Sequence, residues 1–162
     1  MDPESSIAAD ITAHLSDLNW KLQGKNKLIT QLYDDIKCFI TKLSLWKSQL
    51  SCKNLAHFPN CKELKNHTNA ESVLTFAKYE SHLVLLSKEF QERFSDFSSF
   101  EYHFALFSAP FNFDVVKAEK NLQMELLEMQ SDSTLRAKYL EVGIPGFYSY
   151  LPGKFTNFRV FN

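Results

Sequence analysis

Glycine and proline are scarce in this 162-residue chain, which contains four glycines and five prolines. In the first hundred residues only Pro3, Gly24 and Pro59 interrupt the sequence, and this predicts long helices there. Four dispersed glycines cannot form the Gly-rich loop that cradles a phosphate in nucleotide-binding proteins. We therefore predict no cofactor and no small-molecule substrate.

The sequence is also poor in cysteine and lacks long apolar runs. Its three cysteines are an odd number without a dense framework, which is typical of a reducing, intracellular compartment. No stretch approaches the roughly 18 apolar residues of a membrane span, and no charged start precedes an apolar run. With 44% hydrophobic and 23% charged residues, the composition is that of an ordinary globular protein. We expect an intracellular protein without a membrane partner.

A strong overall charge is absent too, because the net charge is −1. This excludes the global basic field that draws many proteins onto nucleic acid. The stretch from Lys37 to Lys65, however, is locally basic, with six lysines and a single acid, Glu63. The stretch is interpreted either as a solvated helix face or as a set of phosphate contacts, namely Lys37, Lys42, Lys47 and Lys53.

Apolar spacing predicts two helices in the first third of the chain. Residues 5–23 have an apolar face of Ile7, Ile11, Leu15, Leu18 and Leu22. Gly24 stands where a helix C-cap favours a residue with positive φ. The second helix is predicted by a seam in steps of three and four, formed by Ile29, Leu32, Ile36, Phe39, Leu43, Trp46 and Leu50. Three heptads are short for an independent coiled coil, which favours packing within the domain over an interface with another chain.

The rest of the sequence predicts further helices and an irregular end. A polar loop is expected at residues 51–69, and a helix at 70–97 capped by Asn69. Residues 122–129 are predicted to be helical, followed by a short helix capped by Ser131 or Asp132. The prediction is an all-α, antiparallel helical array with a core at 1–107, a helical continuation at 108–142 and an irregular aromatic tail at 143–162, the start of a truncated region.

Several short sequence motifs resemble those of a known family, and they occur in the same order along the chain. The segment Asp10–Lys25, DITAHLSDLNWKLQGK, is similar to a stretch of the hAT superfamily of DNA transposases and of its domesticated vertebrate descendants, including the II-I repeat-containing transcription factor family. The resemblance continues through the words FITKLSLW, LAHFP, FQERFSDF, LFSAPF and the run from Tyr139 to Leu151. It therefore covers nearly the whole chain.

The resemblance implies a helical insertion domain of a nuclear, transposase-like protein. In such transposases an RNase H-like core holds divalent metals through two Asp and one Glu, and a helical insertion interrupts that core. The matched words belong to the insertion, so no catalytic residue is assigned in this chain. The resemblance thus implies that the chain is not an enzyme by itself.

Three sets of residues were considered as candidates for metal binding or catalysis. Cys52, His57, Cys61 and His67 could supply four zinc ligands, although their spacing matches no known finger. The alternative is that they are loop residues and that His57 makes a structural hydrogen bond. Asp10 and Asp17 share a helix face but lack a third acid, so we interpret them as a helix cap and a solvated acid. Cys38, next to the seam, is expected to be a buried packing thiol.

The functional hypothesis is a non-catalytic scaffold or interaction module, with protein partners or self-association. One alternative is a DNA-contacting module that uses the Lys37–Lys65 stretch. The other is the inactive fragment of a transposase that gains its catalytic carboxylates from flanking sequence.

Overall fold

The computed structural model describes residues 3–68 and 76–160, and these ranges contain nine α-helices, two 3-10 helices and no strand. The predicted all-α class is confirmed. The chain divides into two compact units, Met1–Phe97 (unit 1) and Ser98–Asn162 (unit 2). The boundaries expected after residues 107 and 142 both fall inside unit 2. Within the described ranges, no helix is both long enough and apolar enough to span a membrane.

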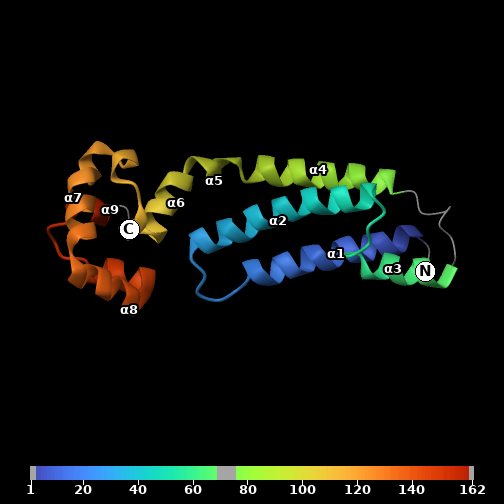
Figure 1. Ribbon diagram of the computed structural model, residues 1–162, viewed down its shortest axis with the longest axis horizontal. Helices are drawn as coiled ribbons and strands as arrows, with labels where there is room; N and C mark the ends of the chain where they lie inside the picture. Colours follow the sequence, from blue (N-terminus) through green and yellow to red (C-terminus); the bar gives the residue numbers. More distant parts are fainter. Residues whose placement is uncertain (1–2, 69–75, 161–162) are drawn as a thin grey trace. The chain divides into compact units, whose positions relative to one another are not determined.

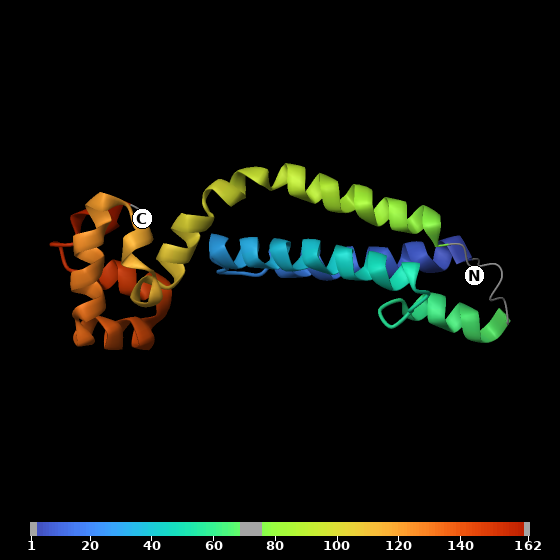
Figure 2. The same cartoon turned by 45° about the horizontal axis from the view of Figure 1, so that its top comes forward.

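Unit 1 is built on three long helices that lie side by side and run antiparallel in chain order (Figures 1 and 2). They are α1 (Pro3–Leu22), α2 (Ile29–Ser51) and α4 (Ala77–Arg93). The shorter α3 (Pro59–Thr68) packs against α1, and α5 (Ser95–Ser99) follows α4. The Asn69 cap and Val73 of the predicted third helix lie outside the described residues.

The α2 seam forms the centre of the unit 1 core. Five of its seven predicted positions are buried, from Ile36 to Leu50. The first two differ from the prediction, because Ile29 is 53% exposed and Leu32 is only partly buried. At this end of α2 the buried aromatic is Tyr33, whose ring stacks on Phe97 of α5 at 6.0 Å. A stacking partner from α5 therefore moves the buried face by one residue.

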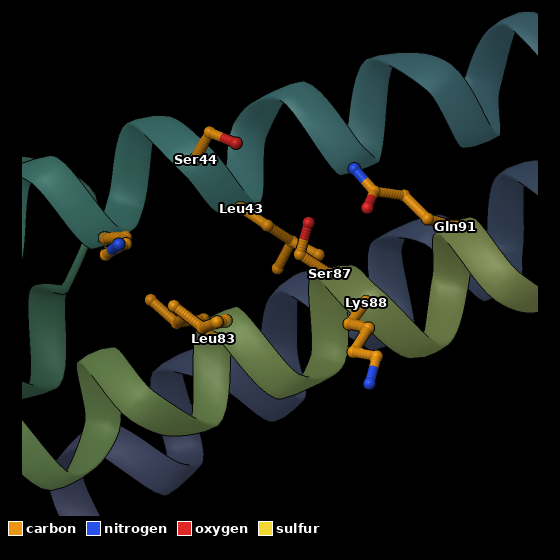
Figure 3. Close-up of a pocket in the computed structure, with 8 residues that line it drawn as sticks. Leu43, Ser44, Leu83, Ser87, Lys88 and Gln91 are labelled. Atoms are coloured by element: carbon orange, nitrogen blue, oxygen red, sulfur yellow. The ribbon is translucent and has the colours of Figure 1, made fainter.

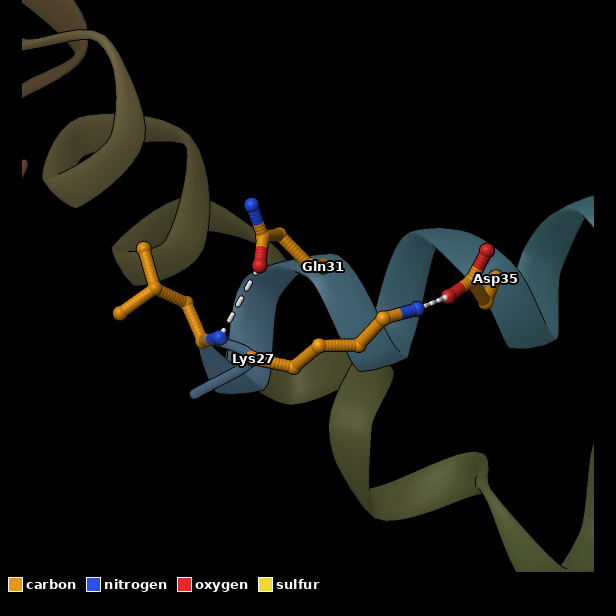
Figure 4. A network of polar contacts seen from close by, with 4 residues as sticks. Lys27, Gln31 and Asp35 are labelled. Atoms are coloured by element: carbon orange, nitrogen blue, oxygen red, sulfur yellow. Dashed lines mark hydrogen bonds and ion pairs between the residues drawn. The ribbon is translucent and has the colours of Figure 1, made fainter. Parts of the chain in front are cut away.

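The connection from α1 to α2 turns at a different residue from the one expected. Asn26 has the positive φ, 60°, whereas Gly24 does not, so the prediction for Gly24 is wrong. Polar contacts then hold the first turns of α2 (Figure 4). The Leu28 amide donates to Gln31 Oε1 at 3.1 Å, and Lys27 Nζ donates to Asp35 Oδ2 at 2.6 Å. Asn tolerates the left-handed region better than most residues, because its short side chain bonds locally.

The predicted loop at residues 51–69 is wrong in its second half, which forms α3. Pro59 is the first residue of this helix, a position where a missing amide hydrogen costs little. The sequence shows little apolar periodicity in this segment, which is why the helix was not predicted. A contact from α1, described below, holds the start of α3.

Unit 2 contains both α-helices and 3-10 helices. They are α6 (Glu101–Ser108), η1 (Pro110–Asn112), η2 (Val115–Lys117), α7 (Lys120–Ser131), α8 (Ser133–Tyr150) and α9 (Thr156–Val160). The core centres on Leu122, Leu126 and Met129 of α7. The predicted Asp132 cap is confirmed, since its carboxylate accepts from the amides of Thr134 and Leu135 at 2.9 and 3.1 Å.

Within the described residues, the expected irregular aromatic tail is largely helical, with a short connection at 151–155, and its aromatic side chains are packed. The α8 helix continues beyond Tyr139 through a kink at Gly143, whose φ of 68° favours glycine. Pro145 lies just after the kink, where the start of a helical segment tolerates it. The tail then contributes buried side chains to the unit 2 core, namely Phe147, Tyr148, Leu151, Phe155 and Phe158. The prediction failed because the partner surface on α7 is not visible in the local sequence.

Candidate functional site

The acid of the first motif, Asp10, points at the start of α3. The residue is buried, with 1% of its surface exposed. Oδ1 accepts from the backbone amide of Asn60 at 3.0 Å and from its side-chain Nδ2 at 2.6 Å, and Oδ2 accepts from the Cys61 amide at 3.1 Å. The first amides of a helix have no partner within the helix, and a negative charge at this end is favourable. Asp10 is therefore a helix cap, as predicted, but it caps a helix 50 residues away.

One turn further along α1, His14 joins the same region to α2. Its ring stacks on Trp46, with centroids 4.0 Å apart and planes 15° apart. His14 Nε2 donates to the backbone carbonyl of His57 at 2.8 Å, so this nitrogen carries a proton. The ring of His14 also meets the edge of Phe58 at 6.1 Å. One histidine thus contacts α2 and the segment that leads into α3.

His57 completes the arrangement through its own ring. Its Nδ1 lies 2.9 Å from Oε1 of Gln49 in α2, which confirms the predicted structural hydrogen bond. We call the whole cluster the motif junction, and it is formed by Asp10, His14, Trp46, Gln49, His57, Phe58, Asn60 and Cys61. The motif words around Asp10 and around His57 are separate in sequence, and the fold brings them into contact.

The Cys61 thiol is buried within the motif junction. Burial, a hydrogen bond to Asp10 and the charge of that carboxylate together raise the pKa of Cys61 to about 12. The thiol therefore stays protonated at neutral pH and is a poor nucleophile, because only the thiolate reacts readily.

The four candidate zinc ligands have separate environments. Cys61 lies against Asp10, and His57 against Gln49. Cys52 is exposed, and His67 Nε2 is 3.9 Å from Glu63 on the surface of α3. Across residues 3–68 and 76–160, no three His, Cys, Asp or Glu side chains are grouped as metal ligands. The structure thus does not bring this set together.

Two other predicted environments can be compared with the structure. Asp17 is exposed, as expected of a solvated acid. Cys38 is also exposed, so its prediction as a buried thiol is wrong. Residue 38 follows the seam position 36 by two places, or about 200° around the helix, which turns it away from the core.

The candidate phosphate contacts Lys37, Lys42, Lys47 and Lys53 are all exposed. The first three follow one another at five-residue spacing along α2. At about 100° per residue, successive lysines point about 140° apart around the helix. Lys53 follows α2 in a turn with φ 55°. The four do not lie on a single helix face, although each is accessible to solvent.

Asn60 and Cys61 were missed as functional partners of Asp10 by sequence reasoning. The available signal was Pro59, because proline is favoured at the first position of a helix. A helix start there implies free amides at the next residues, and the side chain of a Ser, Thr, Asn or Asp usually accepts from them.

Comparisons with known proteins agree with this helical architecture. Residues 3–51 match the FAM200/GTF2IRD2 helical domain family. This range begins at the first residue of α1 and ends at the last residue of α2. No solved structure matches the chain significantly. The chain is thus an all-α region whose first two helices are similar to the FAM200/GTF2IRD2 helical domain.

Two individual proteins are similar to this chain over nearly its whole length. General transcription factor II-I repeat domain-containing protein 2 of Bos taurus is 39% identical over 155 residues, which cover 96% of this chain and 16% of the relative. The protein of the same name from Mus musculus is 41% identical over 154 residues, which cover 95% of this chain and 16% of the relative. The chain is homologous to this part of both proteins and spans about 16% of their length.

Proposed function

We infer that this chain is a non-catalytic helical scaffold through which a nuclear, transposase-derived protein contacts other proteins. The observation that carries the proposal is the use of Asp10 in the motif junction. Both carboxylate oxygens accept hydrogen bonds from the start of α3. A carboxylate engaged in this way holds helices together and has little capacity left to bind a catalytic metal.

The names of the relatives support the same proposal. Both describe a general transcription factor II-I repeat domain-containing protein and no enzyme. Nuclear localisation is proposed on this basis, together with the transposase-like motifs. A fluorescent fusion of the full-length protein would test it, and exclusion from the nucleus would contradict it.

A nicking assay with supercoiled plasmid tests whether the chain is catalytic. The wild-type chain and Asp10→Asn would each be incubated with plasmid and Mg²⁺ or Mn²⁺. We expect no metal-dependent nicking above the protein-free control in either sample. Nicking by the wild type that Asp10→Asn abolishes would overturn the scaffold proposal, because Asp10 would then act on metal or substrate.

DNA contact is the second candidate, supported by the exposed lysines of the Lys37–Lys65 stretch. Phosphate contacts weaken steeply with salt, since binding releases counterions. Fluorescence anisotropy with a labelled duplex would therefore be measured across a salt series. Binding that disappears when Lys37, Lys42 and Lys53 are replaced by Glu would favour this candidate, and no binding at low salt would exclude it.

A further inference from the structure

A short segment of unit 2 joins the end of η2 to the start of α7. It reads Val116-Lys117-Ala118-Glu119, so a branched aliphatic residue precedes the lysine and an acid follows it by two places. No other lysine of the sequence has both of these neighbours. The order aliphatic residue, lysine, any residue, acid is the one that the conjugating enzyme of small ubiquitin-like modifiers recognises around its target lysine.

The three side chains that such an enzyme reads are accessible in this segment. Val116 is 85% exposed, although its side chain is apolar. The side chains of Lys117 and Glu119 are 75% and 48% exposed. Ala118 stands at the position that the enzyme does not read, and it is buried in the unit 2 core. The segment therefore turns its recognised side chains to solvent and its unread one inward.

The backbone of the segment is anchored at both ends. At one end, Asp114 Oδ1 accepts from the Val116 amide at 3.1 Å. At the other end, the Glu119 amide donates to the Tyr102 hydroxyl at 2.8 Å. Between them the backbone is extended, with ψ of 152° at Ala118 and 141° at Glu119. A segment that is already ordered loses less conformational entropy when a partner binds it.

The contacts that the two charged side chains make within the chain are weak. Lys117 Nζ lies 4.0 Å from Asp114 Oδ2, and Glu119 Oε1 lies 3.6 Å from His103 Nε2. Exposed ion pairs of this kind contribute little to stability. Both side chains can therefore exchange these contacts for contacts with an enzyme at small cost.

Exposure alone does not distinguish Lys117 from other lysines. Lys88 of α4 points away from α2, and its side chain is 68% exposed (Figure 3). Ser87 precedes it, however, and Phe90 stands two places after it. Lys88 thus lacks both the aliphatic and the acidic neighbour, and it lies within a long helix.

We propose that Lys117 is an attachment site for a small ubiquitin-like modifier. The deprotonated Nζ attacks the thioester carbonyl carbon that joins the modifier's C-terminal glycine to the cysteine of the conjugating enzyme. A C–N bond forms, the C–S bond breaks, and the leaving thiolate takes up the proton from the nitrogen. Val116 packs on an apolar surface of the enzyme, and Glu119 faces its basic side chains. The site goes beyond the scaffold function and does not depend on it.

The test is a conjugation assay on the whole chain with activating enzyme, conjugating enzyme, modifier and ATP. No ligase is added, so the conjugating enzyme alone must read the segment. A slower band on a denaturing gel reports conjugation, and mass spectrometry of the branched peptide identifies the lysine. The variants are Lys117→Arg, Val116→Ser and Glu119→Gln. The matched control is Lys120→Arg, because Lys120 is exposed three residues further on and follows an acid.

We expect Lys117→Arg to abolish the modified band and Lys120→Arg to be modified at the wild-type rate. Val116→Ser and Glu119→Gln should each slow conjugation at least about tenfold, because an apolar contact or a charge contact with the enzyme is lost. The substituted side chains are exposed, so the circular dichroism of every variant should match that of the wild type.

Three results would overturn the assignment. One is a wild-type chain that is not conjugated, and a synthetic peptide of residues 113–123 then shows whether the fold withholds the segment from an active enzyme. The second is conjugation that maps to Lys120 or that persists in Lys117→Arg. The third is conjugation of Lys117 that neither Val116→Ser nor Glu119→Gln slows, since the enzyme would then not read the segment. None of these results bears on the scaffold proposal, which the plasmid-nicking assay tests separately.

Discussion

Replacing Asp10 with asparagine should destabilise unit 1 by about 2 kcal/mol, because it removes the charge from the start of α3 and one acceptor from a buried site. Asparagine keeps one oxygen for the Asn60 amide. Its amide group then faces the Cys61 amide, so two donors oppose each other where Oδ2 now accepts at 3.1 Å. Losing one charge-assisted hydrogen bond costs about 1.5–3 kcal/mol. Asp10→Ala, which removes the entire cap, should cost about 3 kcal/mol or more.

Urea unfolding followed by tryptophan fluorescence measures this effect on unit 1 alone. The chain has two tryptophans, Trp20 in α1 and Trp46 in α2, and Trp46 stacks on His14 inside the motif junction. A loss of about 2 kcal/mol lowers the urea midpoint by about 1 M at an unchanged m-value. Asp17→Asn is the matched control, because Asp17 is exposed on the same helix and should change stability by less than about 0.5 kcal/mol.

The reasoning is refuted if Asp10→Asn and Asp17→Asn shift the midpoint equally. A double-mutant cycle that combines Asp10→Asn with Asn60→Ala adds a second criterion. The two residues share hydrogen bonds at 2.6 and 3.0 Å, so we expect a coupling energy of about 1 kcal/mol. Additive effects would mean that the observed contact contributes nothing to stability.

Thiol reactivity should distinguish the buried cysteine from the two exposed ones. With Ellman's reagent, Cys38 and Cys52 should react at once, and Cys61 should react only after unfolding. Three fast-reacting thiols would contradict the burial of Cys61. The pKa of Cys61 is raised from 9.0 to about 12, so the folded state holds a proton that the unfolded state loses. Stability should therefore fall as pH rises from about 9 to about 12, and Cys61→Ser should flatten this dependence in urea titrations at several pH values. Gly143→Ala should destabilise unit 2 by about 1 kcal/mol through the positive φ alone, since the added methyl group meets nothing within 4 Å; a calorimetric scan with an unchanged midpoint would contradict this. Tyr148→Phe removes a 3.0 Å hydrogen bond to an α6 carbonyl and should cost about 1 kcal/mol, measured by amide exchange in α8; unchanged protection would exclude the contact.

The parts of the fold that sequence predicted are those with strong local periodicity. The seam from Ile36 to Leu50 repeats over several turns, and all five of its positions are buried. The Asp132 cap was also predictable, because its acceptor and donors are only two and three residues apart. Such signals are contained within one helix and its ends.

The parts that the sequence did not predict depend on distant partners. The α3 helix has few apolar residues, and its cap comes from Asp10. The helical structure of the tail depends on packing of Phe147 and Phe158 with α7 in one core, and the local sequence does not show this packing. The motif junction was predicted in part: the cap role of Asp10 and the hydrogen bond of His57 were expected, but their meeting was not. Spacing along a chain cannot report contacts between motifs 50 residues apart.

The capping of α3 by α1 has a consequence for the order in which unit 1 folds. The α3 helix has ten residues, fewer than the roughly 12–15 that a helix needs to persist alone in water. Its cap also closes a loop of 50 residues, which has an entropic cost before any contact is gained. Nucleation should therefore occur in α1 and α2, with α3 added afterwards. A nascent chain in which α1 cannot dock would expose residues 59–68 as an unstructured segment, open to proteases.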